Sequence, residues 1–228
     1  MYGSPRLHQV LRQAGHRISR KRVIRLMHLD GLRGRMRRRF RTTTVVDPHA
    51  QPATNHLRRR FTVAAPNRVW AADITGMPTH DGWLYLAVVL DLWSRRVVGW
   101  ALRSTLETDL VCAALHVAVA RRTCRRAVLH HSDRGAQYTS DRYQTLLRTY
   151  GFRCSMSRPG NCYDNAPVES FFRTLKTELG PLTHATHRAA ATAIADYIEC
   201  FYNRERLHST LHYQSPAVFE ATWKTAVL

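Results

Sequence analysis

Three acidic residues, Asp73, Asp133 and Glu169, lie where their carboxylates could hold metal ions for phosphodiester chemistry. The chain of 228 residues has only 16 Asp and Glu, so few acids are available for such a site. Two divalent ions about 3.5 to 4 Å apart can activate an attacking oxygen and neutralise a leaving oxygen. Mg²⁺ prefers carboxylate oxygens and keeps several waters, so two or three acids suffice. A site that cuts nucleic acid is therefore expected if the three acids converge.

The two aspartates stand in or just after predicted strands. Asp73 interrupts the apolar segment 70–75, where an unpaired charge would be unfavourable without a cation. Asp133 follows the predicted strand 127–132, and ligands gather at strand ends in open sheets. If strands 69–75 and 127–132 pair side by side, the two carboxylates lie on neighbouring strands. Either aspartate alone is equally well explained as an ordinary turn or helix-capping residue.

Glu169 lies on a predicted helix at 164–179 with two distinct faces. An apolar stripe contains Val168, Phe172, Leu175 and Leu179. A polar line contains Asn165, Glu169, Arg173 and Lys176. Asn165, Arg173 and Lys176 are suited to binding DNA. Glu178, nine residues beyond Glu169, falls on the opposite side at about 100° per residue. The alternative for this polar line is an ordinary solvated helix face.

The elements around these acids predict an α/β fold of the ribonuclease H-like type, with a mixed sheet and helices on both faces. Short turns predict that the first three strands form an antiparallel meander. Helices and strands then alternate along the chain. The expected strands are 69–75, 83–90, 97–102, 127–132 and 152–157, and the expected helices are 107–121, 141–150 and 164–179.

Two short helices before this core resemble a helix-turn-helix module. Ser4 is the expected N-cap of the first helix, with Pro5 at its first position and Gly15 at its end. Ser19 is the expected cap of the second helix, which ends at Gly31. The residues expected to contact DNA on this second helix are Arg20, Lys21, Arg22 and Arg25. A helical hairpin docked on the main domain is the alternative.

A basic segment joins the helices to the core. Residues 33–60 hold nine arginines and one acid, and Arg37, Arg38 and Arg39 are expected to contact DNA. The whole chain has 35 Lys and Arg against 16 acids, a net charge of +19, which favours a polyanionic partner. We interpret the segment as a mobile basic linker, with a merely solvated loop as the alternative. The expected domains are 1–32 (helix-turn-helix), 33–65 (linker), 66–180 (catalytic core) and 181–228 (helical extension).

Other sequence features exclude several protein classes. No stretch approaches the eighteen or so apolar residues that span a bilayer, so no membrane partner is expected. The five cysteines are odd in number and contain no C-x-x-C pair, which fits a reduced cytoplasmic protein. His130 and His131 are more simply explained as structural residues than as ligands of a hydrolytic zinc.

Read together, the acids resemble the D,D(35)E signature of retroviral integrases and bacterial transposases, since 35 residues separate Asp133 from Glu169 (169 − 133 = 36). Lys176 follows the glutamate by seven residues, where that family has a basic residue. Flanking segments resemble the catalytic OrfB product of IS-three type insertion sequences. These segments are 2–6, 73–75, 83–91, 94–95, 98–100, 131–135, 161–166, 202–204, 208–209 and 215–216.

The resemblance implies that Asp73, Asp133 and Glu169 bind two Mg²⁺ or Mn²⁺ ions and that Lys176 contacts the element's end. It implies that hydrolysis frees a 3′-hydroxyl, which then attacks another phosphodiester of double-stranded DNA, without ATP or a covalent protein–DNA intermediate. The DNA partners would be terminal inverted repeats and a target. His212 and Pro159 depart from the family's usual glycine and lysine. Without cysteine before Cys112, the zinc module of retroviral integrases is ruled out.

The resemblance also implies partners for the chain. A homo-multimer on DNA is expected because two element ends must be processed, in the bacterial cytoplasm at the nucleoid. Ile194, Ile198 and Phe201 on a helix at 187–204 could form the protein–protein contact, or could pack on the chain's own core. The start at Tyr2-Gly3-Ser4-Pro5 suggests missing upstream residues, and such enzymes are often frameshift fusions with an upstream DNA-binding product.

Three other functions are compatible with parts of the sequence. A DNA-binding protein with a dead catalytic domain would keep the basic surface, but the three acids argue against it. A ribonuclease acting on RNA–DNA hybrids would share the fold and metals, whereas the linker arginines and first helices favour duplex DNA. A structural nucleoid protein would need the charge but not the acids.

Overall fold

The computed structural model describes residues 2–34, 52–123 and 127–227 of the chain. Its centre is a five-stranded sheet in the order β3-β2-β1-β4-β5. The strands are β1 (Val69–Thr79), β2 (Gly82–Asp91), β3 (Val97–Arg103), β4 (Leu129–Ser132) and β5 (Arg153–Met156). β1, β2 and β3 form the expected antiparallel meander. β4 pairs in parallel with β1, and β5 with β4, so the predicted mixed sheet is confirmed.

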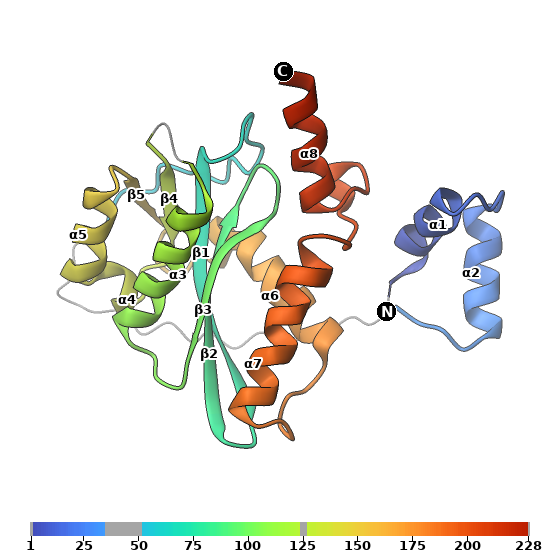
Figure 1. Ribbon diagram of the computed structural model, residues 1–228, viewed down its shortest axis with the longest axis horizontal. Helices are drawn as coiled ribbons and strands as arrows, with labels where there is room; N and C mark the ends of the chain where they lie inside the picture. Colours follow the sequence, from blue (N-terminus) through green and yellow to red (C-terminus); the bar gives the residue numbers. More distant parts are fainter. Residues whose placement is uncertain (1, 35–51, 124–126, 228) are drawn as a thin grey trace.

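Helices cover both faces of this sheet, as expected for a ribonuclease H-like fold. Figure 1 shows α3, α4 and α5 on one side and α6 and α7 on the other. Their bounds are α3 (Thr108–Arg121), α4 (Ala136–Thr139), α5 (Asp141–Thr149), α6 (Ala166–Leu179) and α7 (His187–Asp196). A 3-10 turn, η1 (Cys162–Asn165), precedes α6, and a π-helical segment, η2 (Tyr197–Tyr202), continues α7.

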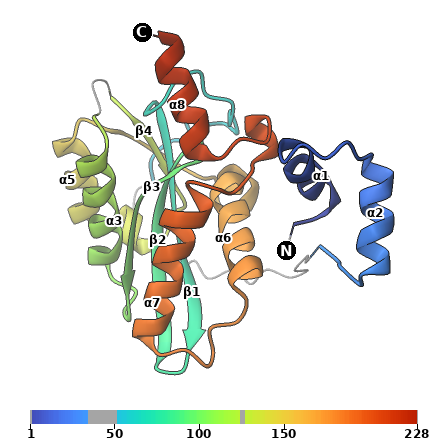
Figure 2. The ribbon, with the colours of Figure 1, turned by 45° about the vertical axis from the view of Figure 1, so that its right-hand side comes forward.

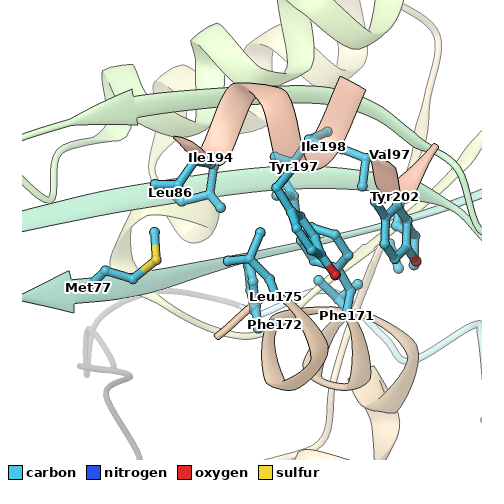
Figure 3. Packing of buried hydrophobic residues seen from close by; sticks show 14 of the residues in the cluster. Met77, Leu86, Val97, Phe171, Phe172, Leu175, Ile194, Tyr197, Ile198 and Tyr202 are labelled. Carbon is cyan, nitrogen blue, oxygen red and sulfur yellow. The ribbon is translucent and has the colours of Figure 1, made fainter. Parts of the chain in front are cut away.

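Two apolar clusters fill the space between the layers. Figure 3 shows the cluster between the sheet and α6, α7 and η2, where Phe171, Leu175 and Ile194 lie among strand residues. The second cluster packs the other sheet face against α3 and α5. At Gly99 the sheet and α3 approach so closely that an added Cβ would lie 2.3 Å from the Ala114 carbonyl oxygen.

The two N-terminal helices lie beside the α6 and α7 layer, away from α3 and α5 (Figure 1). They are α1 (Ser4–Gln13) and α2 (Arg20–Leu29). Ser19 caps α2 as predicted, since its hydroxyl accepts from the backbone N–H of Arg22 at 3.3 Å. The assignment of Ser4 as a cap is wrong: Gly3 is the capping residue and Ser4 is already helical. Gly15 follows α1 with φ of +87°, which ends the helix as expected.

The described part of the basic linker, residues 52–65, lies against the core. Leu57 is only 2% exposed, and the backbone N–H groups of His56 and Leu57 donate to the Ser155 hydroxyl on β5. These contacts are contrary to the mobile linker that the sequence suggested for this part. Arg37, Arg38 and Arg39, predicted to contact DNA, lie outside the described residues.

The C-terminal region returns across the sheet face covered by α6. Ile194 and Ile198 are fully buried in the chain's own core, which confirms for these two residues the second of the two alternatives that the sequence left open. A 3-10 turn, η3 (Ser209–Leu211), leads to a last helix, α8 (Pro216–Val227). It lies in the expected helical extension, although the sequence pattern did not give its bounds. His212, one of the two positions that the resemblance marked as a departure, adopts a left-handed φ of +53°, the conformation that favours glycine. No described helix is long and apolar enough to cross a membrane.

Candidate active site

Asp73 projects from the middle of β1 toward the layer that contains α6. Side chains alternate between the two faces of a strand, and Ala71 and Met77 of β1 belong to the cluster beneath α6. Asp73 shares their parity, and its strand partner Val88 lies in the same cluster. The Asp73 carboxylate is half-buried, and its Oδ1 accepts a hydrogen bond from the N–H of Ile74 at 2.8 Å.

Asp133 follows β4 at the position that matches Asp73. The parallel register pairs Ala71 with His131, an offset of 131 − 71 = 60, and the same offset relates Asp73 to Asp133. The Asp133 Oδ1 accepts from the N–H of Gly135 at 3.0 Å, which turns the chain sharply after the strand. A Cβ at Gly135 would lie 3.1 Å from this oxygen, so glycine suits the turn. The predicted pairing of the two strands is confirmed.

Glu169 reaches the same region from the first turn of α6. Pro167 lies at the start of the helix, where its missing N–H is no loss. The start of α6 is fastened to β1, because Asn165 Nδ2 donates to the carbonyl oxygen of Ala72 at 3.1 Å. This bond holds the helix next to the residue that precedes Asp73. The partial positive charge of a helix N-terminus also favours acids at this end.

Electrostatic coupling indicates that the three acids are neighbours. Burial raises the pKa of Asp73 well above its usual range, Asp133 and Glu169 raise it further, and Lys176 opposes them. Burial also raises the pKa of Glu169, while Arg173 lowers it. Three carboxylates in one half-buried place repel one another, so the cluster favours either protonation or a bound cation.

The donor set suits a hard divalent cation. Carboxylate oxygens are the ligands that Mg²⁺ prefers, and Mg²⁺ usually keeps waters and binds through one or two carboxylates and substrate phosphates. Within the described ranges, no three His, Cys, Asp or Glu side chains are gathered closely enough to hold a metal ion. The acids are therefore close neighbours without forming a finished coordination sphere.

The three residues on or just before α6 that were predicted to bind DNA differ in their exposure to solvent. Arg173 is exposed on α6. Lys176 is half-buried, and its ammonium donates to the carbonyl oxygen of Gly76 at 2.9 Å, which holds it beside the acids. Asn165 was predicted to face DNA, but its side chain is only 3% exposed. This is a correction: the 3-10 turn before α6 rotates Asn165 inward, where it positions the helix.

The basic residues of α2 lie far from the three acids along the chain. Arg20, Lys21, Arg22 and Arg25 are exposed, whereas Val23 and Met27 are buried against α1 and its surroundings. The helix therefore presents a basic outer face that is open to a polyanion.

Sequence reasoning missed the residues that hold the segment before α6. Asp164 is fully buried and binds Arg158 and Arg59 at 2.9 and 2.8 Å. These bonds hold the pKa of Asp164 well below its usual range, Arg158 having the largest effect, although burial opposes it. His131 lies nearby, with its two ring nitrogens 2.9 and 3.2 Å from the hydroxyls of Ser155 and Ser157. Arg59 lies 105 residues before Asp164, so no pattern in the sequence around Asp164 could have predicted this ion pair.

Glu178 has a structural partner on the far side of α6, as its helical position predicted. Its carboxylate binds the guanidinium of Arg206 through both oxygens and accepts from the Tyr197 hydroxyl at 2.6 Å. Arg206 is only 4% exposed. Replacing Glu178 would leave a buried guanidinium unpaired, so this acid stabilises the fold and is not inert.

Sequence families match nearly the whole chain. Two models described as an integrase core domain match residues 63–162 and 150–216. A model described as an HTH-like domain matches residues 1–40, which supports the predicted helical module before the core.

Solved viral proteins share this fold. The simian T-cell lymphotropic virus intasome, in complex with the PP2A regulatory subunit B56 gamma, matches with a TM-score of 0.58 and 18% identity, covering 95% of this chain and 74% of that chain. The HTLV-2 integrase catalytic core in complex with magnesium matches with a TM-score of 0.51 and 16% identity, covering 68% and 96%. Both likenesses concern the fold alone.

Curated relatives are bacterial transposases. The chain is 44% identical over 221 residues to the transposase InsF of insertion sequence IS3A from Escherichia coli K12, covering 96% of this chain and 76% of InsF. It is 43% identical to the transposase of IS904 from Lactococcus lactis, covering 96% and 87%. Given this identity along almost its whole length and its integrase core, the chain belongs to the IS3 family of insertion-sequence transposases.

Proposed function

We propose that this transposase cuts DNA at the ends of its insertion sequence and joins the freed strands to a target, with Asp73, Asp133 and Glu169 as the catalytic acids. The observation that carries the proposal is the register of β1 with β4, which sets Asp73 and Asp133 on neighbouring strands, while Glu169 lies in the first turn of the helix that Asn165 fastens to β1. The effect of Asp133 and Glu169 on the pKa of Asp73 supports the proposal.

The reaction that we propose has two steps on DNA. Hydrolysis of a phosphodiester at the element's end frees a 3′-hydroxyl, and this hydroxyl then attacks a phosphodiester of the target strand. Two Mg²⁺ or Mn²⁺ ions held by the acids would supply activation of the attacking oxygen and neutralisation of the leaving oxygen. The HTLV-2 integrase core is a fold relative in complex with magnesium, which supports divalent ions here.

The chain's own residues prepare the site for this chemistry. The N–H groups of Ile74 and Gly135 fix the orientation of the two aspartates. Asn165 fastens α6 to β1 and thereby sets the approach of Glu169. Lys176, held at the Gly76 carbonyl, offers positive charge beside the acids for a DNA phosphate.

DNA binding by the rest of the molecule supplies affinity and position. We assign phosphate and base contacts to Arg20, Lys21, Arg22 and Arg25 on α2, and further contacts to Arg173 on α6 and to Arg37, Arg38 and Arg39. The exposed basic face of α2 and the HTH-like match at residues 1–40 support the first assignment. The net charge of +19 supplies long-range attraction to DNA.

Assembly on DNA is part of the proposal. Two element ends require two active sites, so we propose a homo-multimer when the ends are bound. A viral intasome has the same fold, which supports assembly of this kind. An upstream frameshift-fused DNA-binding product remains a proposed partner, and the place of action is the nucleoid in the bacterial cytoplasm.

Glu169→Gln tests the catalytic assignment. The substitution keeps shape but removes the charge that helps to hold metal, so binding of a labelled end duplex should stay within about twofold. Nicking and joining in Mg²⁺ should both fall by at least about a hundredfold, the loss expected when a transition-state interaction of about 2.7 kcal/mol is removed.

Glu205→Gln is the matched control, because it removes the same charge from an exposed position outside the acid cluster. It should bind, nick and join like the unmodified protein. Substantial nicking by Glu169→Gln, or loss of nicking in Glu205→Gln, would show that the third carboxylate has been assigned wrongly. Glu178→Gln is unsuitable as a control because it disrupts the ion pair with Arg206.

A further inference from the structure

A pocket of about 280 Å³ lies where α1 meets α6 and the segment that leads to α8. Figure 2 shows α1 beside this segment, and Tyr2 and Arg6 both bond to the backbone of Leu207. Ser170 and Thr174 of α6 line the pocket. Glu169 and Arg173 are not among its lining residues, so the pocket adjoins a different face of α6 from the active site.

The wall of this pocket is strongly cationic. Arg6 comes from α1, Arg95 from the turn between β2 and β3, and Arg206 from the segment after η2. Arg206 is neutralised by Glu178 through two-oxygen pairing. Glu178 also acts on Arg6, and Asp91 acts on Arg95. Three guanidinium groups therefore stand against two carboxylates, which leaves an excess of positive charge at a partly buried place.

Among the described residues, the guanidinium groups of Arg6 and Arg95 donate hydrogen bonds to carbonyl oxygens, and Arg6 also lies over the Tyr2 ring. Arg6 Nε donates to Leu207 at 2.9 Å and Arg95 Nη2 donates to Phe61 at 3.0 Å. Each guanidinium has five N–H donors, so most of its donors stay available. Burial lowers the pKa of both groups, and Arg206 lowers that of Arg6 further, while Glu178 opposes the change at Arg6 and Asp91 opposes it at Arg95.

His208 adds a further donor position to the same wall. Its ring packs edge-on against Tyr202 with centroids 4.9 Å apart. The Nε2 atom is buried and has no hydrogen-bond partner among the described residues. A buried polar atom without a partner is unfavourable. Burial and the neighbouring arginines lower the pKa of His208 to about 3, so the neutral imidazole, in its Nε2–H tautomer, would donate to an anion in the pocket.

We infer that this pocket binds a phosphate group, held by Arg6, Arg95 and His208, and that the bound phosphate fastens the N-terminal helices to the catalytic domain. Guanidinium groups bind phosphate through paired hydrogen bonds, and hydroxyls of Ser170 and Thr174 line the same space. The pocket volume is near the lower end of the range for small-ligand sites, about 300 to 1,000 Å³. The source of the phosphate is either a DNA phosphodiester or the free ion.

Thermal unfolding of the full chain tests the site with inorganic phosphate. At a phosphate concentration ten times the dissociation constant, the melting temperature should rise by about 3 to 6 °C above a sodium chloride control of equal ionic strength. Arg6→Gln and Arg95→Gln should each raise the dissociation constant for phosphate about tenfold or more, since each removes charge-assisted hydrogen bonds. Arg12→Gln, at an exposed position on α1 outside the pocket, should respond like the unmodified protein.

The shift of the melting temperature on adding phosphate is measured for each variant against the same variant without phosphate. A variant that is less stable at the start is therefore not mistaken for one that has lost phosphate binding. The inference is overturned if phosphate raises the melting temperature no more than chloride does. It is equally overturned if Arg6→Gln and Arg95→Gln keep the full response, because the ion then binds elsewhere.

Duplex binding identifies the source of the phosphate. If a DNA phosphodiester occupies the pocket, Arg95→Gln should reduce the slope of log affinity against log salt by about 0.9, the value of one phosphate contact. If the slope is unchanged while the phosphate response is lost, the pocket takes the free ion. Glu169→Gln should keep the phosphate response, so failure of the catalytic assignment and failure of this inference are distinguishable.

Discussion

Asp164→Asn should destabilise the protein by about 2 to 3 kcal/mol at pH 7. The carboxylate is fully buried and accepts five hydrogen bonds from three residues. The Arg158 side chain donates two of them and the Arg158 backbone N–H a third. Arg59 and Asn55 each donate one more. An asparagine keeps one acceptor oxygen but directs an NH₂ group toward donors. The buried site is therefore left with unsatisfied groups.

The size of the effect follows from the exposure of the partners. Breaking a buried ion pair costs about 3 to 5 kcal/mol when a charge is stranded. Here Arg59 and Arg158 are 43% and 55% exposed, so water can solvate them after the change and each exposed pair is worth at most about 1 kcal/mol. The remaining loss comes from Asn55 and the backbone N–H, which bond the charged oxygen at 2.8 and 3.0 Å.

The effect should also depend on pH with a definite sign. Arg158 holds the pKa of Asp164 well below its usual range in the folded state, whereas the unfolded value is about 3.9. The carboxylate therefore contributes its full stability above about pH 4 and loses it as the pH falls below that value. The deficit of Asp164→Asn should be constant from pH 7 to 5 and shrink below pH 4.

Urea denaturation followed by circular dichroism at several pH values measures this deficit. Asp141→Asn, at an exposed site in the first turn of α5, serves as a control and should cost less than about 1 kcal/mol. A deficit below about 0.5 kcal/mol for Asp164→Asn at pH 7 would refute the reasoning. A deficit that stays the same at pH 3.5 would refute the assignment of its pH dependence.

Two further predictions follow from close packing and from charge. Gly99→Ala should lower the free energy of unfolding, measured by urea denaturation, by about 2 to 3 kcal/mol, because the added Cβ would lie 2.3 Å from the Ala114 carbonyl oxygen. A decrease of less than about 1 kcal/mol would contradict the close approach of β3 and α3. Replacing Arg20, Lys21, Arg22 and Arg25 together by Gln should reduce the salt slope of duplex binding, measured by fluorescence anisotropy, by up to about 3.6. Arg148→Gln, exposed on α5, should leave the slope nearly unchanged, and an unchanged slope in the fourfold variant would exclude α2 from DNA binding.

The sequence predicted the order of the core elements because their hydrophobic patterns are long and regular. The strand 83–90 is almost continuously apolar, and it became β2, which lies between β1 and β3 in the sheet. The position of Asp73 within an apolar strand was enough to predict a half-buried carboxylate. The register of β1 with β4 had no such signal, because pairing between strands 60 residues apart is decided by packing of the whole sheet.

Other features were wrong or missed for identifiable physical reasons. Helical periodicity placed Asn165 on the outer face with Glu169, but the 3-10 turn before α6 changes the rotation per residue. An apolar ridge has the same sequence pattern whether it meets a partner or the chain's own core, which is why the sequence left both alternatives open for Ile194 and Ile198. Arg59 was counted among linker charges, although it pairs with the buried Asp164.

The parallel register of β1 and β4 has a consequence for the growing chain. Strand β4 can pair with β1 only after the ribosome has released both, and α6 is synthesised later still. On the proposed assignment, an unfinished or prematurely terminated polypeptide that lacks residue 169 cannot complete the acid cluster, even if its basic N-terminal helices already hold DNA. A one-residue slip of β4 would likewise turn Asp133 to the opposite sheet face. On the same assignment, the chain could cut DNA only after the sheet and α6 have folded together.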